Sequence, residues 1–214
     1  MKKIDLFLFD LDGTLADTGR DIAAAVNYAL GALNLRPLAP ERILTYVGDG
    51  VGELIRRCLG PENEGIFDEV LFVFKEYYDR HLLDTTVLYP GVRESLAAFR
   101  NKRKAVLSNK GHHFVLKVLA GLGIRDFFDA VIGGDVFPYK KPDPRIVLPL
   151  LDRWGAPPDR TVMVGDGRND ILLAKETGIL SCAFLNGLTR REDLLALGPD
   201  YTCEDMGELT RIFC

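Results

Sequence analysis

The chain has few of the residues that build disulfide frameworks or metal clusters. Its 214 residues include only four cysteines and three histidines. No two cysteines form a CxxC pair, and none has a histidine nearby at zinc-finger spacing. We therefore expect reduced thiols. The adjacent His112 and His113 are expected in a solvated first turn of a helix rather than in a metal site. The cysteines are Cys58, Cys182, Cys203 and Cys214.

Long apolar runs and an excess of positive charge are also missing. No run approaches the roughly 20 apolar residues that span a bilayer. Acidic residues interrupt the N-terminal segment MKKIDLFLFDLDGT before a signal-peptide core could form. The net charge of −4 and the pI near 5.5 provide no basic surface for nucleic acid. We expect a cytoplasmic protein that binds neither membranes nor nucleic acid.

Five short apolar runs predict buried strands. Each is rich in β-branched or aromatic residues and is followed by turn residues, which is typical of strands covered on both faces of a parallel sheet. Helical patterns lie between most of them, as in GVRESLAAFR after Pro90 and HHFVLKVLAGLG after Gly111. This alternation predicts a doubly wound, Rossmann-like α/β sheet. The expected strands are 4 to 9, 104 to 108, 129 to 134, 161 to 165 and 182 to 185.

A long stretch, about residues 16 to 85, contains no convincing strand. Thr18 followed by Asp21 resembles a capping box that opens the helix DIAAAVNYALGAL. Two more helical runs follow, at 51 to 59 and 67 to 83. A crossover between parallel strands needs only about a dozen residues or slightly more, so we expect a small helical domain inserted after the first strand. The expected units are an α/β core of residues 1–15 and 86–214 and a helical domain of residues 16–85.

Polar side chains follow four of the predicted strands at the point where each strand ends. In open α/β sheets, ligands bind beyond the carboxyl ends of the strands, where the strand order reverses. Each of these residues alone is typical of a solvated turn. Their repeated placement along one βα series predicts a phosphoryl-transfer site. The residues are Asp10 and Asp12 after the first strand, Ser108 and Asn109 after the second, Lys141 after the third, and Asp166 and Asp170 after the fourth.

Carboxylates placed so close together require positive charge between them. Mg²⁺ prefers oxygen ligands, so Asp10, the backbone carbonyl of Asp12, and Asp166 are expected to hold it, with Asp170 beside them. If the Asp10 carboxylate attacks phosphorus, Asp12 is free to protonate the leaving oxygen and then to accept a proton from water.

The phosphate needs its own partners. Lys141 would neutralise phosphoryl oxygens, and the Ser108 hydroxyl with nearby N–H groups would hold another. Gly13 and Thr14 let the chain turn tightly behind the site. The full set expected to bind substrate or phosphate is Ser108, Asn109, Lys110, Gly13 and Thr14.

These motifs resemble those of the haloacid dehalogenase-like hydrolase superfamily, over essentially the whole chain. DLDGT at 10 to 14, SN at 108 and 109, Lys141 of KKPDP, and GDGRND at 165 to 170 resemble its four motifs in order. The resemblance implies that Asp10 is the phosphorylated nucleophile and Asp12 the acid and base. Dehalogenases of the family lack the second Asp, so its presence implies phosphate chemistry. The helical insert resembles the family's C1 cap, which closes over the core site on two hinges.

Within the family, the segments TYVGDGVGELIRRCL, VLSNK, KKPDP and VGDGRNDILLAKETG are most similar to phosphoglycolate phosphatases. One departure is GDG in the fourth motif, where SDS or GDS is more usual. The expected function is therefore Mg²⁺-dependent hydrolysis of a small phosphorylated metabolite, 2-phosphoglycolate leading, through an aspartyl-phosphate. The expected assembly is a monomer or a homodimer.

Two other functions stay open. A β-phosphoglucomutase-like enzyme or a pyrophosphatase would share the same core, although mutases of this kind carry an Arg in the cap loop where this chain has GDGVG. A phospho-accepting receiver also uses a Mg²⁺-bound Asp at a strand end. Receivers have no cap, so the helical insert is unexplained on that view.

Three local questions also stay open. Lys110 either reaches the substrate or points to solvent at a helix start. Lys140 competes with Lys141, which is favoured because it directly precedes Pro142 as the family motif implies. The GDGVG segment at 48 to 52 either offers N–H groups to an anion or forms a tight turn between helices, and the charge of Asp49 argues against the anion.

Overall fold

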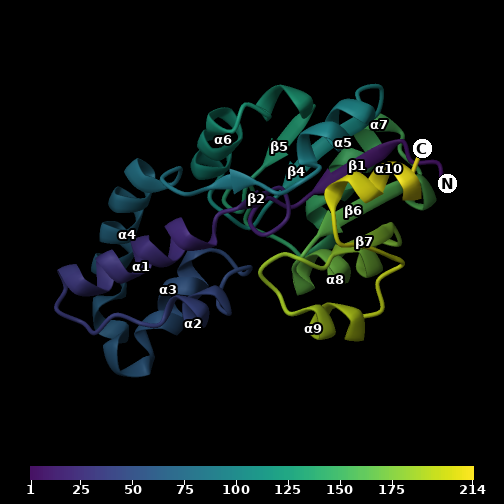
Figure 1. Ribbon diagram of the computed structural model, residues 1–214. Coiled ribbons are helices and arrows are strands. Elements are labelled where there is room, and N and C mark those ends of the chain that lie inside the picture. Colours follow the sequence, from purple (N-terminus) through teal and green to yellow (C-terminus); the bar gives the residue numbers. More distant parts are fainter.

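The computed structural model describes residues 1–214 and confirms the predicted α/β sheet. All strand pairs in the central sheet are parallel, and the strand order is β5-β4-β1-β6-β7-β8 (Figure 1). The strands are β1 (Leu6–Phe9), β4 (Arg103–Leu107), β5 (Ala130–Ile132), β6 (Thr161–Gly165), β7 (Leu180–Phe184) and β8 (Tyr201–Cys203).

Both faces of the sheet are buried under helices. Successive side chains of a strand point to opposite faces. Phe7 and Phe9 therefore pack into one apolar cluster with α5, α6 and α10, whereas Leu6 and Leu8 pack into another with α7 and α8. The core helices are α5 (Val92–Ala98), α6 (His112–Gly121), α7 (Leu148–Trp154), α8 (Arg168–Thr177), α9 (Arg191–Ala196) and α10 (Leu209–Ile212), with single 3₁₀ turns η2 (Arg125–Phe127), η3 (Pro144–Ile146), η4 (Pro158–Arg160) and η5 (Met206–Glu208).

The strand order reverses beside β1. The chain runs from β1 to β4 and β5 on one side, and β6 then returns to the other side of β1. In the register of the sheet, Phe9 lies opposite Val106 of β4 and Val164 of β6. Asp10 therefore leaves the sheet between the ends of β4 and β6, which is where a doubly wound sheet binds its ligand.

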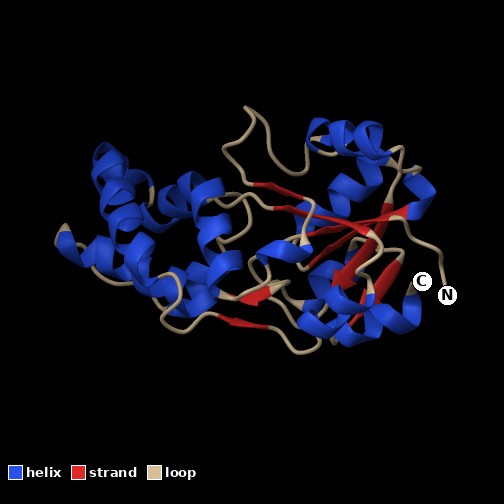
Figure 2. Ribbon diagram, turned by 90° about the horizontal axis from the view of Figure 1, so that it is seen from above, coloured by secondary structure: helices blue, strands red, loops and turns tan.

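Four helices lie between two short strands that pair with each other. Figures 1 and 2 show these helices grouped to one side of the sheet. The antiparallel strands β2 and β3 pair Asp17 with Val87, so the chain enters and leaves the helical group at one place. Whether the group is a separate domain with the predicted boundaries stays a prediction. The elements are β2 (Ala16–Asp17), α1 (Gly19–Ala32), α2 (Pro40–Leu44), α3 (Val51–Leu59), η1 (Pro61–Ile66, 3₁₀), α4 (Phe67–His81) and β3 (Val87–Leu88).

Amphipathic faces hold the helical group together. Helix α1 packs along α4, and α3 packs on α4 as well. Val26 and Ala29 of α1 and Val70 and Phe74 of α4 are buried at these contacts in the same apolar cluster. The spacing of these residues by three and four is what places them on one side of each helix. No helix combines the length and apolar character needed to cross a bilayer.

Several expectations about short elements were incomplete or wrong. Strand β8 was not predicted, because its three residues lie at the sheet edge and Thr202 is exposed, so the apolar signal is short. Strands β2 and β3 were also not predicted, and β2 lies inside the stretch expected to have no strand. His112 and His113 were expected in the first turn of a helix, and this is confirmed. Helix α6 begins at His112, and His113 is exposed. All four cysteines are free.

The predicted capping box at α1 is wrong. Thr18 occupies the N-cap position but makes no side-chain cap hydrogen bond, because its hydroxyl donates to Asp12 at 2.6 Å. Asp21 is buried and accepts five hydrogen bonds from Thr85 and Thr86, through both backbone N–H groups and both hydroxyls. The carboxylate thus fastens the start of α1 to the segment that leads into β3.

We expect Asp21→Asn to destabilise the protein. The amide loses acceptor capacity while the donors of Thr85 and Thr86 stay buried, and unsatisfied buried donors of this kind cost about 1–3 kcal/mol. Urea unfolding should show this loss, whereas Asp152→Asn, which changes an exposed carboxylate without hydrogen-bond partners, should change the unfolding free energy by less than about 0.5 kcal/mol. Equal effects of the two substitutions would contradict the role of Asp21.

Candidate active site

Three carboxylates from different parts of the chain meet at the carboxyl ends of β1 and β6. Oxygens of Asp10, Asp166 and Asp170 all lie within 4.8 Å of one another. Asp10 follows β1 directly, Asp166 follows β6, and Asp170 lies in the first turn of α8. The sequence separates Asp10 from the other two by more than half of the chain, so the sheet register brings them together.

Asp166 is held by the turn that follows β1. Its Oδ1 accepts the Thr14 hydroxyl at 2.7 Å, its backbone N–H donates to Thr14 Oγ1 at 2.9 Å, and its Oδ2 accepts the Leu188 N–H at 2.7 Å. Gly13 has a φ of +79°, and a Cβ there would lie 2.2 Å from Asp166 Oδ2. Only glycine therefore fits at position 13.

This arrangement leaves Gly13 and Thr14 no free donor for a phosphate. The Gly13 N–H donates to Ala16 O and the Thr14 N–H to Leu11 O, while the Thr14 hydroxyl donates to Asp166. The expectation that these two residues bind substrate or phosphate is not supported by these contacts. They shape the position of Asp166 instead.

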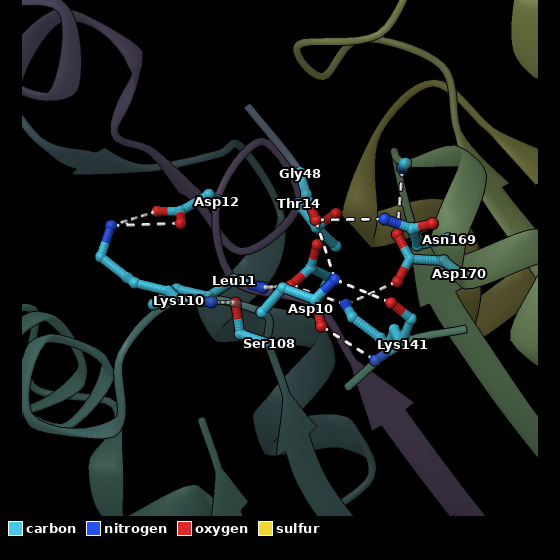
Figure 3. A network of polar contacts seen from close by, with 12 residues as sticks. Asp10, Leu11, Asp12, Thr14, Gly48, Ser108, Lys110, Lys141, Asn169 and Asp170 are labelled. Carbon is cyan, nitrogen blue, oxygen red and sulfur yellow. Dashed lines mark hydrogen bonds and ion pairs between the residues drawn. The ribbon is translucent and has the colours of Figure 1, made fainter. Parts of the chain in front are cut away.

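Lys141 lies between two of the carboxylates. Its Nζ is 3.0 Å from Asp10 Oδ1 and 2.7 Å from Asp170 Oδ1 (Figure 3). Burial opposes the charge of this ammonium, but Asp10 and Asp170 outweigh that effect and raise the pKa of Lys141. The Asp170 Oδ2 atom accepts the Gly167 N–H at 3.0 Å, which fixes the carboxylate in place. Lys141 is therefore charged and is held by two ion pairs.

The neighbouring lysine points elsewhere. Lys140 donates to the backbone carbonyl of Asp49, so Lys141 is the lysine that contacts Asp10. Asn109 secures this choice, because its side chain accepts the Lys141 N–H at 2.9 Å and donates to the Lys141 carbonyl at 3.0 Å. The Asn109 side chain thus positions the lysine loop.

Asp12 and Lys110 lie on the other side of Asp10. Figure 3 shows the Lys110 ammonium facing the Asp12 carboxylate, away from Lys141. Its Nζ is 2.8 and 3.1 Å from the two Asp12 oxygens and 2.7 Å from the hydroxyl of Tyr78 in α4. Burial opposes the charge, but Asp12 and the Tyr78 hydroxyl raise the pKa of Lys110 above its ordinary value. Lys110 therefore points into the site rather than to solvent.

The charges of the site match one divalent cation. When Asp10, Asp12, Asp166 and Asp170 are all ionised, the ammonium groups of Lys110 and Lys141 leave two negative charges without a partner. Burial, reinforced by the charge of Asp10, raises the pKa of Asp166 to about 7. Carboxylate oxygens are ligands that Mg²⁺ prefers. Asp10, Asp166 and Asp170 therefore suit Mg²⁺ both in ligand type and in charge.

The loop before α3 rests on this site. The Gly48 carbonyl accepts the amides of Asn109 at 2.9 Å and Asn169 at 3.1 Å, and Asn169 also donates to Asp49 Oδ1 at 2.8 Å. Asp49 Oδ2 pairs with Arg57 at 2.6 Å. Gly48 O and Asp49 Oδ1 thus accept hydrogen bonds from the core, whereas Gly50 and Val51 line the cavity beside Asp10. The segment is a turn that contacts the core, and binding of an anion by its N–H groups stays a prediction.

A small cavity lies between the carboxylates and the helical group. Its volume is about 60 Å³, and Ser108 faces it together with Asp10, Asp12 and Lys110. Helices α1, α3 and α4 supply the opposite, apolar wall. A ligand in this cavity would touch the sheet end and the helices at the same time.

Three contributors to the site were not predicted from the sequence. Tyr78 has the pattern of a buried core aromatic, and Leu188 acts through its backbone N–H, which carries no residue-type signal. Asn169 could have been found, since it lies inside the GDGRND motif beside Asp170. Asn169 contacts the loop at Gly48 and Asp49, and the sequence does not indicate that these two segments meet.

The metal-free protein should lose stability as pH rises. The folded state retains a proton on Asp166 up to about pH 7, whereas the unfolded chain releases it near the ordinary value of 3.8. The stability that this proton contributes is present at low pH and is lost as pH rises through about 7. Urea unfolding with chelator, from pH 5 to pH 8, should show wild type losing stability relative to Asp166→Asn. A constant difference between the two proteins would contradict this, and added Mg²⁺ should reduce the pH dependence.

Comparisons with known proteins agree with this geometry. A family model described as haloacid dehalogenase-like hydrolase matches residues 4–178. A phosphoglycolate phosphatase of Chromobacterium violaceum is 36% identical over 216 residues, covering 98% of this chain and 96% of that protein. One from Vibrio cholerae serotype O1 is 36% identical over 221 residues, covering 99% of this chain and 98% of that protein.

Solved structures show the same likeness. The crystal structure of a predicted phosphoglycolate phosphatase from Haemophilus somnus 129PT matches with a TM-score of 0.92 and 30% identity over 99% of both chains. The resemblance inferred from the four motifs is confirmed, as is the expectation of a hydrolase. The chain therefore belongs to the haloacid dehalogenase-like hydrolase family.

Proposed function

We propose that this hydrolase is a Mg²⁺-dependent phosphatase that cleaves a small phosphomonoester, with 2-phosphoglycolate as the leading substrate. The observation that carries the proposal is the placement of Asp10. Its carboxylate lies at the tip of β1, within 4.8 Å of two buried carboxylates and 3.0 Å from Lys141. Relatives named phosphoglycolate phosphatase that align over nearly the whole chain support the choice of substrate.

Asp10 is the nucleophile of the proposed reaction. An Asp10 carboxylate oxygen bonds to phosphorus, the bond from phosphorus to the ester oxygen breaks, and Asp12 donates its proton to that leaving oxygen. Asp12 then takes a proton from water as the water oxygen attacks phosphorus. Inorganic phosphate leaves, and the Asp10 carboxylate is restored.

The other residues hold the phosphoryl group. Lys141 neutralises its oxygens, and the Ser108 hydroxyl donates to another of them. Asp10, Asp166, Asp170 and the Asp12 carbonyl hold Mg²⁺. The bound ion compensates the negative charge that otherwise keeps a carboxylate from approaching a phosphate.

The helical group serves as the cap of the C1 type in this proposal, with residues 16–85 moving on residues 1–15 and 86–214. Pairing of β2 with β3 and the contacts of Asp21 support a single attachment point for such a movement. The cytoplasmic location and the choice between monomer and homodimer stay predictions.

The Asp10→Asn protein should have no phosphatase turnover. An amide cannot act as the nucleophile, so release of inorganic phosphate from 2-phosphoglycolate should fall by at least about a thousandfold. Asp159→Asn, which alters an exposed carboxylate far from the site, should retain wild-type turnover. Chelator should abolish wild-type activity, and Mg²⁺ should restore it.

Other outcomes would identify other functions. Retained turnover in Asp10→Asn would end the aspartyl-phosphate mechanism. Conversion of a hexose 1-phosphate to the 6-phosphate without phosphate release would identify a mutase, and preferential cleavage of pyrophosphate would identify a pyrophosphatase.

The contact of Asn169 with the cap loop should support catalysis. Asn169→Ala removes the hydrogen bonds to Gly48 and Asp49, so KM should rise by about five- to tenfold, as expected for about 1–1.5 kcal/mol. The double variant with Asp49→Ala should lose less than the sum of the two single variants, because both substitutions remove the Asn169–Asp49 hydrogen bond. Asn186→Ala, whose amide donates to Glu204 O, serves as the control. Fully additive effects of Asn169→Ala and Asp49→Ala would contradict a shared contact.

A further inference from the structure

Lys110 is the only cation that lines the cavity beside Asp10. The cavity holds about 60 Å³, and a single water requires about 10–15 Å³ of such space. Because Asp10, Asp12 and Ser108 also line this cavity, its space includes that of the phosphoryl group, and only a small leaving group fits beside it. A leaving group of this size can carry one further functional group. The chemistry of the wall decides which group that is.

Few side chains of the wall can bind a second polar group. The apolar part comes mainly from the helical group, and among the polar lining side chains the proposed reaction already uses Asp10, Asp12 and Ser108. Asn109 is occupied by backbone groups of Lys141 and Gly48. Lys110 and Tyr78 remain. The apolar lining residues are Ile22, Val47, Val51, Leu54, Phe74 and Phe114.

Lys110 and Tyr78 together offer donors. The Tyr78 hydroxyl accepts from Lys110 and makes no other hydrogen bond, so its own proton is free to donate. Burial raises the pKa of Tyr78 to about 12, so the hydroxyl stays protonated. The ammonium also lies 4.7 Å above the Tyr78 ring, which holds it in place. An ammonium and a phenol O–H side by side are complementary to the two oxygens of a carboxylate.

The geometry points to a carboxylate site formed by Lys110 and Tyr78, and we propose that it selects phosphomonoesters of short hydroxy acids. This inference rests on the proposed phosphatase function. Asp12 protonates the ester oxygen in that function, and Lys110 Nζ lies 2.8 Å from Asp12. A second anion reaches Lys110 only if it is a few bonds away from the ester oxygen. A two-carbon acid meets this requirement.

Binding of the carboxylate exchanges one partner of Lys110 for another. Without substrate, the ammonium is fully engaged by two Asp12 oxygens and the Tyr78 hydroxyl. A substrate carboxylate replaces Asp12 in this set, and Asp12 keeps the Thr18 hydroxyl at 2.6 Å. The exchange preserves an ion pair for Lys110. Asp12 carries a proton when it acts as the acid of the proposed reaction, so it then leaves no unpaired charge.

The approach to the cavity also favours an anion. A second cavity of about 400 Å³ shares five lining residues with the first and continues between α4, α6 and the loop after β5. Its wall adds Lys75 and Lys140, with Asp135 as its one acid. A doubly anionic substrate therefore meets positive side chains before it reaches Lys110.

The test compares substrates with and without the carboxylate. Wild type should prefer 2-phosphoglycolate to ethyl phosphate, which has the same number of carbons. Lys110→Met should reduce this preference in kcat/KM by about 30- to 100-fold, and Tyr78→Phe, which keeps the ring, by about three- to tenfold. Lys117→Met, which changes a half-exposed lysine paired with Asp79, should leave the preference unchanged. Thermal unfolding identifies any variant that fails to fold.

Two results would overturn the inference. Equal losses with both substrates in Tyr78→Phe and Lys110→Met would mean that these residues act on Asp12 rather than on a carboxylate. Equal use of both substrates by wild type would mean that the cavity does not recognise the acid.

Failure of the proposed function has a different signature. If wild type hydrolyses neither compound, calorimetric titration of the Asp10→Asn protein with 2-phosphoglycolate and with ethyl phosphate in the presence of Mg²⁺ still measures the site. Tighter binding of 2-phosphoglycolate that is lost in the added Tyr78→Phe substitution would support the carboxylate site. Equal binding of the two compounds would overturn it.

Discussion

The mutual repulsion of carboxylates at the end of β1 is the constraint on which the rest of the site depends. Buried acids that are not paired become neutral or require a cation. Here Lys141 pairs with Asp10 and Asp170, and Lys110 pairs with Asp12, at distances of 2.7 to 3.0 Å. The remaining negative charge matches that of one divalent cation. Both lysines come from strand-end loops, so the sheet supplies the acids and their partners together.

The backbone around these charges is built for close approach. Gly13 and Gly165 pack directly against Asp166 and Asp170, and a Cβ at either position would lie 2.2 Å from the carboxyl group. The Thr14 hydroxyl donates to the Asp166 carboxylate and accepts the backbone N–H of Asp166. These residues make no proposed contact with substrate. They determine the positions of the Asp166 and Asp170 carboxylates. Residues of the motifs that carry no reactive group therefore still affect the geometry of the site.

The sequence predicted the sheet, five of its six strands and the meeting of Asp10 with Asp166, because buried parallel strands and polar strand ends have a strong residue-type signal. Short elements such as β8 and the β2–β3 pair have too few residues for a periodic pattern. The roles of Asp21, Asn169 and Tyr78 depend on contacts with Thr85, Gly48 and Lys110, and single-sequence patterns do not indicate which distant segments meet. The capping-box interpretation failed for the same reason, since distant partners outcompeted the local ones.

The position of β1 has a consequence for how the chain reaches its native state. Leu6 pairs with Arg103 on one side and Thr161 on the other, and all four β1 side chains are buried. Strand β1, the most apolar strand, precedes its partners β4 and β6 by about 100 and 150 residues in the chain. The helices between β1 and β4 can pack through more local contacts. Completion of the sheet therefore requires long-range contacts, and until they form LFLF is an apolar segment open to association with other chains.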